Sequence, residues 1–169
     1  MTTNPHSLTI AILTVSDTRQ HHNDTSGNFL VTACEDVGHT VCEKIIVRDD
    51  IYDLRAVVSR WIADDSVDVV ISTGGTGFMS RDSTPEAISV LFDKTVDGFG
   101  ELFRANSVDD IGTSTIQSRA FAGIANHTVI FCLPGSTGAC KTGWEIIQPQ
   151  IDSHNKPCNF VSHLRNKSR

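Results

Sequence analysis

Short, β-branched apolar runs alternate with amphipathic helical patterns along most of this chain, and this alternation limits the folds open to it. Apolar runs of strand length occupy residues 8–15, 40–47, 67–71 and 128–133. Apolar side chains at helical spacing occupy residues 29–37, 54–62, 85–92, 99–105 and 144–151. Alternating strands and helices predict a parallel sheet whose two faces are both covered by helices. We therefore expect an α/β fold of three layers with a mostly parallel sheet.

Length and composition indicate one globular domain. The chain has 169 residues, of which 39% are apolar and 20% are charged, and this is ordinary for a globular protein. No repeat, low-complexity block or linker divides it. We expect a single domain over residues 8–160, followed by a polar C-terminal tail at 161–169.

The formal net charge of −6 argues against a nucleic-acid-binding face and against binding to an anionic membrane. It is compatible with a small anionic ligand, because a few backbone amides are enough to bind a phosphate. Residues 1–6 lack the features of a signal peptide, and no apolar run approaches 18 residues. These observations predict a cytoplasmic protein.

Cysteine and histidine patterns do not indicate a metal centre or a disulfide framework. The five cysteines are odd in number and show no C-x-x-C spacing. Cys34, Cys42 and Cys132 lie in apolar segments, where we expect them to be small core residues. The seven histidines have no ligand spacing, and surface positions are expected for them.

The run Thr73-Gly74-Gly75-Thr76-Gly77 is the strongest indication of a ligand site. It follows the strand predicted at 67–71 and leads to a helix that Ser83 or Thr84 could cap. In open α/β sheets, ligands bind at this end of a strand. Glycines let bare N–H groups approach an anion, and the two threonine hydroxyls would add donors. Asp82 nearby would need a metal or a proton beside a phosphate.

Other interpretations of this loop were weighed. No Gly-Lys-Ser/Thr follows, so it is not a P-loop, and the spacing G-x-G-x-x-G of a dinucleotide site is absent. A glycine pair can also be a plain tight turn without a ligand. The Arg81-Asp82 pair and the capped helix that follows favour a binding site over that alternative.

Two further predicted strands end in polar turns, Ser16-Asp17 and Pro134-Gly135-Ser136. In a doubly wound sheet these turns and the glycine loop would open at the same edge. The second strand ends near Asp49, which by itself is best interpreted as part of a solvated turn before the next helix. Together with Asp82, a shared metal or base role becomes a reasonable hypothesis.

Six short segments, taken in order, resemble the MoaB/MogA family of molybdenum cofactor biosynthesis, whose domain also occurs in gephyrin. They are Thr73 to Gly77, Arg81-Asp82, Thr84 to Ala87, Gly98 to Glu101, Ser118 to Ala120 and Leu133 to Ser136. The resemblance runs from about residue 10 to about residue 160. Thr142 to Glu145 and Cys158 to Phe160 resemble the MoaB branch in particular.

The resemblance implies a molybdopterin-binding fold that transfers AMP from MgATP to the terminal phosphate of molybdopterin and releases pyrophosphate. It implies that Asp49 and Asp82 are the catalytic, Mg²⁺-holding aspartates. Molybdopterin and phosphate contacts would fall on Thr73, Gly74, Gly75, Thr76, Gly77, Ser107, Ser118, Pro134, Gly135 and Ser136. Ser16 and Asp17 would lie on the nucleotide side.

Some MoaB-branch proteins lack one aspartate and bind molybdopterin without adenylylating it, so a non-catalytic molybdopterin- or nucleotide-binding protein is the alternative. This chain has both aspartates. It departs from many relatives at Phe78-Met79-Ser80, where a proline often precedes the arginine. The resemblance also implies a homo-oligomer, a trimer or a hexamer of paired trimers, and contacts with other proteins of the cofactor pathway.

Overall fold

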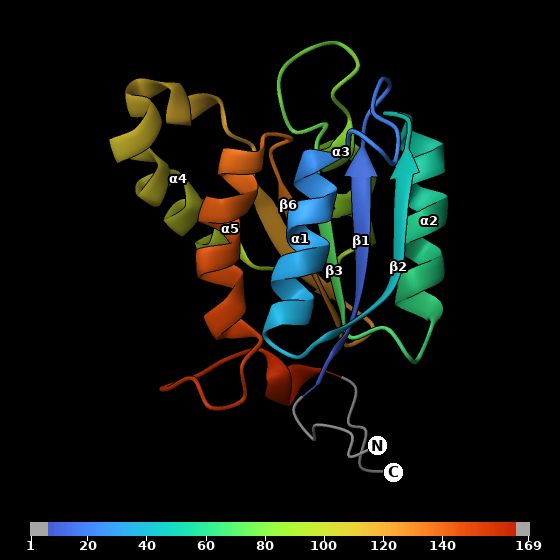
Figure 1. Ribbon diagram of the computed structural model, residues 1–169, viewed down its shortest axis with the longest axis vertical. Helices are drawn as coiled ribbons and strands as arrows, with labels where there is room; N and C mark the ends of the chain where they lie inside the picture. The colour runs from blue at the N-terminus through green and yellow to red at the C-terminus, as the bar shows by residue number, and fades with distance from the viewer. Residues whose placement is uncertain (1–6, 165–169) are drawn as a thin grey trace.

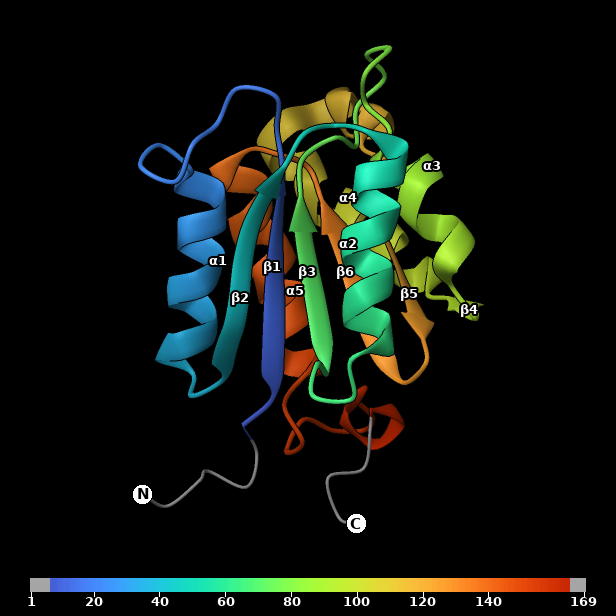
Figure 2. The same ribbon diagram turned by 90° about the vertical axis from the view of Figure 1, so that its right-hand side faces the viewer.

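Four adjacent parallel strands make up most of a six-stranded sheet in the computed structural model, which describes residues 7–164 (Figures 1 and 2). The parallel strands are β1 (Thr9–Val15), β2 (Thr40–Val47), β3 (Val69–Thr73) and β6 (Thr128–Leu133). The strand order is β2-β1-β3-β6-β5-β4, with β5 (Phe121–Ala125) antiparallel to β6 and to β4 (Lys94–Thr95).

Helices cover both faces of the sheet (Figures 1 and 2). One face packs against α1 (Thr25–Asp36), α4 (Asp97–Ile111) and α5 (Thr137–Gln150). The other packs against α2 (Ile51–Ala63) and α3 (Thr84–Ile88). Three short 3₁₀ turns are η1 (Ser89–Leu91), η2 (Gly112–Gln117) and η3 (Val161–His163). The predicted three-layer α/β fold is confirmed.

The central strands are apolar along most of their length because each of their faces meets a different core. Ile10 and Ile12 of β1 belong to the core beneath α1, α4 and α5. Ala11 and Leu13, which point to the opposite face, belong to the core beneath α2 and α3. All four side chains are fully buried, as expected for a parallel strand inside a sheet.

A buried carboxylate fixes the start of α1. Asp24 accepts hydrogen bonds from Gly27 N (3.0 Å) and Thr14 Oγ1 (2.8 Å), and it pairs with Lys44 Nζ (2.8 Å). Burial opposes its ionisation, but the Lys44 ammonium, the Gly27 amide and the Thr14 hydroxyl together lower the pKa of Asp24 below its usual value. This network joins α1, β1 and β2 next to the carboxyl end of β1.

The structure differs from the sequence-based expectation at two strands and at the bounds of several helices. The helices expected from residues 29 and 144 begin earlier, at Thr25 and Thr137, and the one expected to reach residue 92 ends at Ile88 before η1. β4 and β5 were not predicted, and the helix expected at 99–105 continues to Ile111 in α4. In β5, Gly123 leaves space for the ring of Phe92, which packs directly on it. A strand of five residues with a central glycine lacks the alternation that identifies strands.

Two expectations about individual segments also change. Cys34 and Cys132 are buried as predicted, but Cys42 is exposed because it lies on β2 at the edge of the sheet. In the predicted tail, Val161 packs against the core and Leu164 is buried within it. The packed core therefore extends to Leu164, and residues 165–169 lie outside the described residues. Among residues 7–164, no helix is long and apolar enough to cross a membrane.

Candidate ligand-binding site

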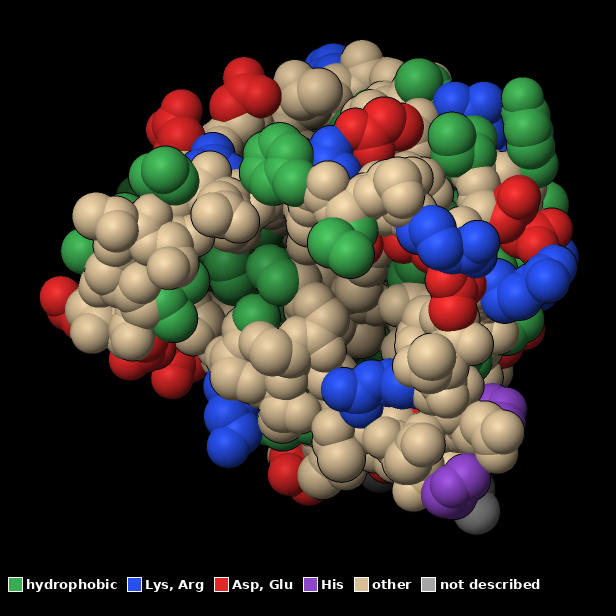
Figure 3. Space-filling view, turned by 90° about the horizontal axis from the view of Figure 1, so that it is seen from above, with side chains coloured by type: hydrophobic (Ala, Val, Ile, Leu, Met, Phe, Trp, Pro, Cys, Tyr) green, Lys and Arg blue, Asp and Glu red, His purple; other side chains and the backbone are tan. Residues whose placement is uncertain are grey.

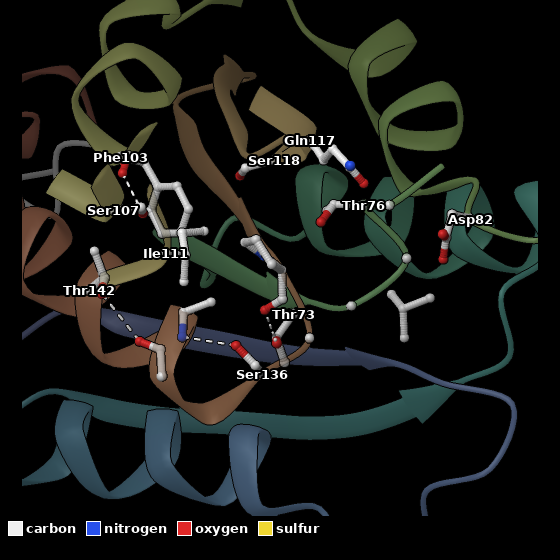
Figure 4. A pocket seen from close by; sticks show the side chains of 18 of the residues that line it. Thr73, Thr76, Asp82, Phe103, Ser107, Ile111, Gln117, Ser118, Ser136 and Thr142 are labelled. Carbon is white, nitrogen blue, oxygen red and sulfur yellow. Dashed lines mark hydrogen bonds between the residues drawn. The ribbon is translucent and has the colours of Figure 1, made fainter. Parts of the chain in front are cut away.

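A cavity of about 610 Å³ opens at the carboxyl ends of β1, β3 and β6 (Figures 3 and 4). Its walls come from the ends of these strands, from α4 and η2, and from the start of α5. Eleven predicted binding residues and Asp82 line it, namely Ser16, Thr73, Gly74, Gly75, Thr76, Gly77, Asp82, Ser107, Ser118, Pro134, Gly135 and Ser136. The doubly wound sheet thus brings the three predicted turns together at one edge.

The glycine loop presents amide groups that are not used elsewhere. Gly74 and Gly75 have φ angles of +104° and +67°, a backbone conformation that residues with a side chain rarely adopt. The Gly74 N–H donates to Leu133 O at 2.9 Å, whereas the N–H groups of Gly75, Thr76 and Gly77 have no hydrogen-bond partner among residues 7–164. Amides left in this way beside a cavity can bind an anion.

The two threonines of the loop have different roles. The hydroxyl of Thr73 is buried and donates to Pro134 O at 2.9 Å, so it holds the ends of β3 and β6 together. Thr76 lines the cavity, and within the described part of the chain its hydroxyl makes no hydrogen bond (Figure 4). The prediction that both hydroxyls serve a ligand is therefore corrected, because only that of Thr76 is available.

The turn after β6 brings the N terminus of α5 to the cavity. Ser136 caps this helix by accepting from Ala139 N at 3.1 Å. Gly135 lies close to the glycine loop, and a Cβ there would be 3.3 Å from Gly74 Cα. Its carbonyl accepts from Ser26 Oγ at 2.8 Å, which ties the turn to α1. The first amides of a helix and its dipole favour an anion at this position.

Asp49 and Asp82 lie beside two different glycines of the loop. A Cβ on Gly75 would be 2.6 Å from Asp49 Oδ2, and a Cβ on Gly77 would be 2.5 Å from Asp82 Oδ2. Asp82 lines the cavity, but Asp49 lies outside its lining. Asp49 Oδ1 accepts from both the backbone N (3.0 Å) and the hydroxyl (2.5 Å) of Ser83.

Burial raises the pKa of Asp49, and the nearby carboxylates of Asp82 and Asp17 raise it further, while the two bonds from Ser83 oppose this shift. A cation at this position would offset the cost of burying the Asp49 carboxylate and would reduce its repulsion by the neighbouring carboxylates. Asp49 Oδ2 and Asp82 Oδ1 receive no hydrogen bond from residues 7–164. Two carboxylate oxygens suit Mg²⁺, which takes one or two carboxylates and completes its shell with phosphates and water.

Groups of three or more His, Cys, Asp or Glu that could hold a metal by themselves do not occur in the described part of the chain. Asp17 does not add to the pair, because Arg81 holds it through contacts of 2.5 and 2.9 Å. The Arg81 guanidinium keeps the pKa of Asp17 below its usual value. Asp17 lines a smaller pocket beside the main cavity, and Ser16 borders both.

The wall formed by α4 and η2 was largely missed. Phe103, Asp110, Ile111, Ser114 and Gln117 line the cavity there (Figure 4). Their segment was expected to be a shorter helix followed by irregular chain, and no local signal placed it over the glycine loop. Ser107 was predicted, although its hydroxyl donates to Phe103 O at 2.7 Å within the same helix.

Comparison with known proteins gives one consistent family. Residues 11–153 match the family model described as "Probable molybdopterin binding domain". The chain is 55% identical over 157 residues to molybdenum cofactor biosynthesis protein B of Escherichia coli K12, covering 92% of each chain. It is 41% identical over 149 residues to the protein of that name from Bacillus subtilis, covering 87% of this chain and 88% of that one.

Two solved structures similar to this chain are of proteins in the same family. The chain resembles a crystal structure of molybdenum cofactor biosynthesis protein B with a TM-score of 0.83 and 41% identity, over 86% of this chain and 91% of that one. It resembles the "tungsten cofactor synthesizing protein MoaB" of Pyrococcus furiosus with a TM-score of 0.82 and 36% identity, over 96% and 99% of the chains.

Proposed function

We propose that this chain, which belongs to the family of molybdenum cofactor biosynthesis protein B and carries its molybdopterin-binding domain, transfers AMP from MgATP to the terminal phosphate of molybdopterin. One observation carries the proposal. Unpaired amides of the glycine loop lie beside two carboxylates, each of which has an oxygen that accepts no hydrogen bond from residues 7–164. A site for anion binding alone has no use for two carboxylates beside the anion.

In the proposed reaction, an oxygen of the terminal phosphate of molybdopterin attacks the α-phosphorus of ATP. A new P–O bond forms, the bond between the α-phosphorus and its bridge to the β-phosphate breaks, and pyrophosphate leaves. Both reactants are anions, so the protein must hold them in line and reduce their repulsion.

Different residues in and beside the cavity would bind the two reactants. The amides of Gly75, Thr76 and Gly77 and the start of α5 would bind the terminal phosphate of molybdopterin. Asp49 and Asp82 would hold Mg²⁺, which would neutralise charge on the ATP phosphates when bound. Ser16 and Asp17 would lie on the nucleotide side, where Arg19 and Arg48 line the adjoining pocket.

The competing function is molybdopterin binding without chemistry. The test is to incubate the purified protein with molybdopterin and MgATP and to separate the products by chromatography. Adenylyl-molybdopterin in amounts equal to pyrophosphate supports AMP transfer. Saturable molybdopterin binding with unchanged ATP supports the binding protein instead and defeats the enzyme proposal. The Asp82→Asn variant is the control for non-enzymatic transfer.

We also propose a homo-oligomer, a trimer or a hexamer. Leu102, Val108 and Ile111 on α4 and Ile116 on η2 are large apolar side chains that are each about half exposed or more. Exposed apolar side chains of this size are common at contacts between protein chains. Ile146, Ile147 and Ile151, which could have faced a neighbouring chain, belong to the core.

A further inference from the structure

Arg119 lies between η2 and β5, and its guanidinium donates hydrogen bonds to carbonyl groups at the end of the glycine loop. Its Nε donates to Thr76 O (3.2 Å) and Gly77 O (3.1 Å). Its Nη2 donates to Gly77 O (2.6 Å) and Asp82 O (3.3 Å). One side chain therefore bonds to both ends of the segment that carries the predicted catalytic carboxylate.

The guanidinium is itself held in place from two sides. Its Nη1 pairs with the carboxylate of Glu86, in the first turn of α3. The carbon of the guanidinium lies 5.0 Å from the centre of the Phe78 ring, within the range of a cation–π contact. The Arg119 side chain is 24% exposed, so these bonds are partly shielded from water. Arginine suits this role because its planar fork presents several donors in fixed directions.

The direction of the carbonyls determines the direction of the amides. In a trans peptide group the N–H points opposite to the C=O. When the carbonyls of Thr76 and Gly77 point to Arg119, the N–H groups of Gly77 and Phe78 point away from it. Gly77 borders the cavity, whereas Arg119 does not. Arg119 thus acts on the loop from the side opposite to a ligand.

Asp82 depends on the same segment. Its Oδ2 accepts from Met79 N at 2.8 Å, and its own N–H donates to Met79 O at 2.9 Å. The segment from Met79 to Asp82 is therefore a closed turn, and Arg119 bonds the carbonyl of Gly77 just before it and that of Asp82 at its end. Loss of the guanidinium would release the turn and the carboxylate together.

We propose that Arg119 is the positioning residue of the site: it holds the Gly77 end of the glycine loop with the Gly77 amide toward the cavity and fixes Asp82, without touching substrate. The proposal deepens the proposed function and rests on it for the effect on AMP transfer. A simple surface ion pair with Glu86 would contribute little and would leave the loop unchanged when removed.

The experiment compares Arg119→Lys with Arg60→Lys in the full chain. Arg60 is a matched control, because it also pairs with a glutamate, Glu43, at 2.9 Å and lies 5.5 Å from an aromatic ring, that of Trp61. It makes no hydrogen bond to the glycine loop. Lysine keeps the charge in both variants but loses the planar fork. Hydrogen exchange of the peptide covering residues 74–82, molybdopterin titration and AMP transfer are measured for each.

We expect the hydrogen-bonded amides of Met79 and Asp82 to exchange at least about tenfold faster in Arg119→Lys, and molybdopterin to bind about tenfold more weakly, as loss of charged hydrogen bonds implies. Its kcat for AMP transfer should fall further than its affinity, since Asp82 is also displaced. Arg60→Lys should match wild type in all three. Equal loop exchange and affinity in the two variants would overturn the proposal.

If Arg119→Lys does not fold, Arg119→Gln decides, because it keeps an N–H donor at this position, loses the planar fork that bonds the carbonyls of Thr76, Gly77 and Asp82, and leaves the loop sequence intact. Faster loop exchange in that variant supports the proposal, and wild-type exchange overturns it. If wild-type protein forms no adenylyl-molybdopterin, the proposed function fails, but loop exchange and molybdopterin affinity still decide the role of Arg119.

Discussion

Gly75→Ala tests whether the glycine loop and Asp49 work as one unit. Gly75 has φ +67°, and a side chain in this region is strained by about 1–3 kcal/mol. For a domain of this size, 1 kcal/mol lowers Tm by about 2–4 °C, so the strain predicts a fall of about 2–12 °C. Typical stabilities of about 5–15 kcal/mol let the variant fold.

The new Cβ would also collide with Asp49 and with the hydroxyl of Thr84. It would lie 2.6 Å from Asp49 Oδ2, whereas ordinary contacts begin near 3.4 Å, so the carboxylate must move by about 0.8 Å. Misplacement on the order of 1 Å can cost about 10²-fold in rate. We therefore expect AMP transfer to fall about 10²-fold, with the terminal phosphate of molybdopterin bound more weakly because the loop shifts.

Gly112→Ala is the matched control. Gly112 also has a positive φ, +56°, but a Cβ there would meet no atom within 4 Å. It should show the fall in Tm without the loss of rate. Thermal melts, molybdopterin titrations and AMP-transfer rates are measured for both variants. A Gly75→Ala protein with wild-type rate and affinity would refute the link between loop and carboxylate, as would an equal loss of rate in Gly112→Ala.

Three further outcomes are expected. Asp82→Asn should lower kcat by about 10²–10³-fold while molybdopterin affinity stays near wild type, because the amide keeps the shape but not the charge; an equal loss of affinity would make Asp82 a binding residue. Because burial raises the pKa of Asp49, its charge costs stability once the pH exceeds the folded pKa. Asp49→Asn should therefore raise Tm at pH 7 and by less near pH 4, and a gain that is larger in acid would contradict this. Light scattering should give a trimer or a hexamer, and a monomer at working concentration would refute the proposed assembly.

The sequence was sufficient for the parts of the fold that follow from local pattern. The four parallel strands lie within two residues of their predicted bounds, because uninterrupted apolar runs such as Val69 to Ile71 are long enough to identify. The edge of the sheet at which the site lies could also be predicted, because ligands bind at the carboxyl ends of the strands in open α/β sheets. β5 could not be found in this way, because Gly123 is explained only by the Phe92 ring packed on it.

Contacts between distant segments were the other limit. Arg119 has no local signal, since its partners lie 33 to 43 residues away in the loop and in α3. The pairing of Asp17 with Arg81 spans 64 residues, and the sequence treated each only as part of its own turn. The α4 and η2 wall is similar, because its place over the cavity depends on tertiary packing. Such placements need the structure.

The most direct test of AMP transfer uses ATP labelled at one phosphate and follows the label in the presence of the protein, molybdopterin and Mg²⁺. With ATP labelled at the α-phosphate, we expect the label in adenylyl-molybdopterin, formed at the same rate as pyrophosphate and about 10²–10³-fold more slowly by Asp82→Asn. With ATP labelled at the γ-phosphate, we expect the label only in pyrophosphate. Molybdopterin that binds to the protein but acquires no α-label would contradict the proposed enzyme.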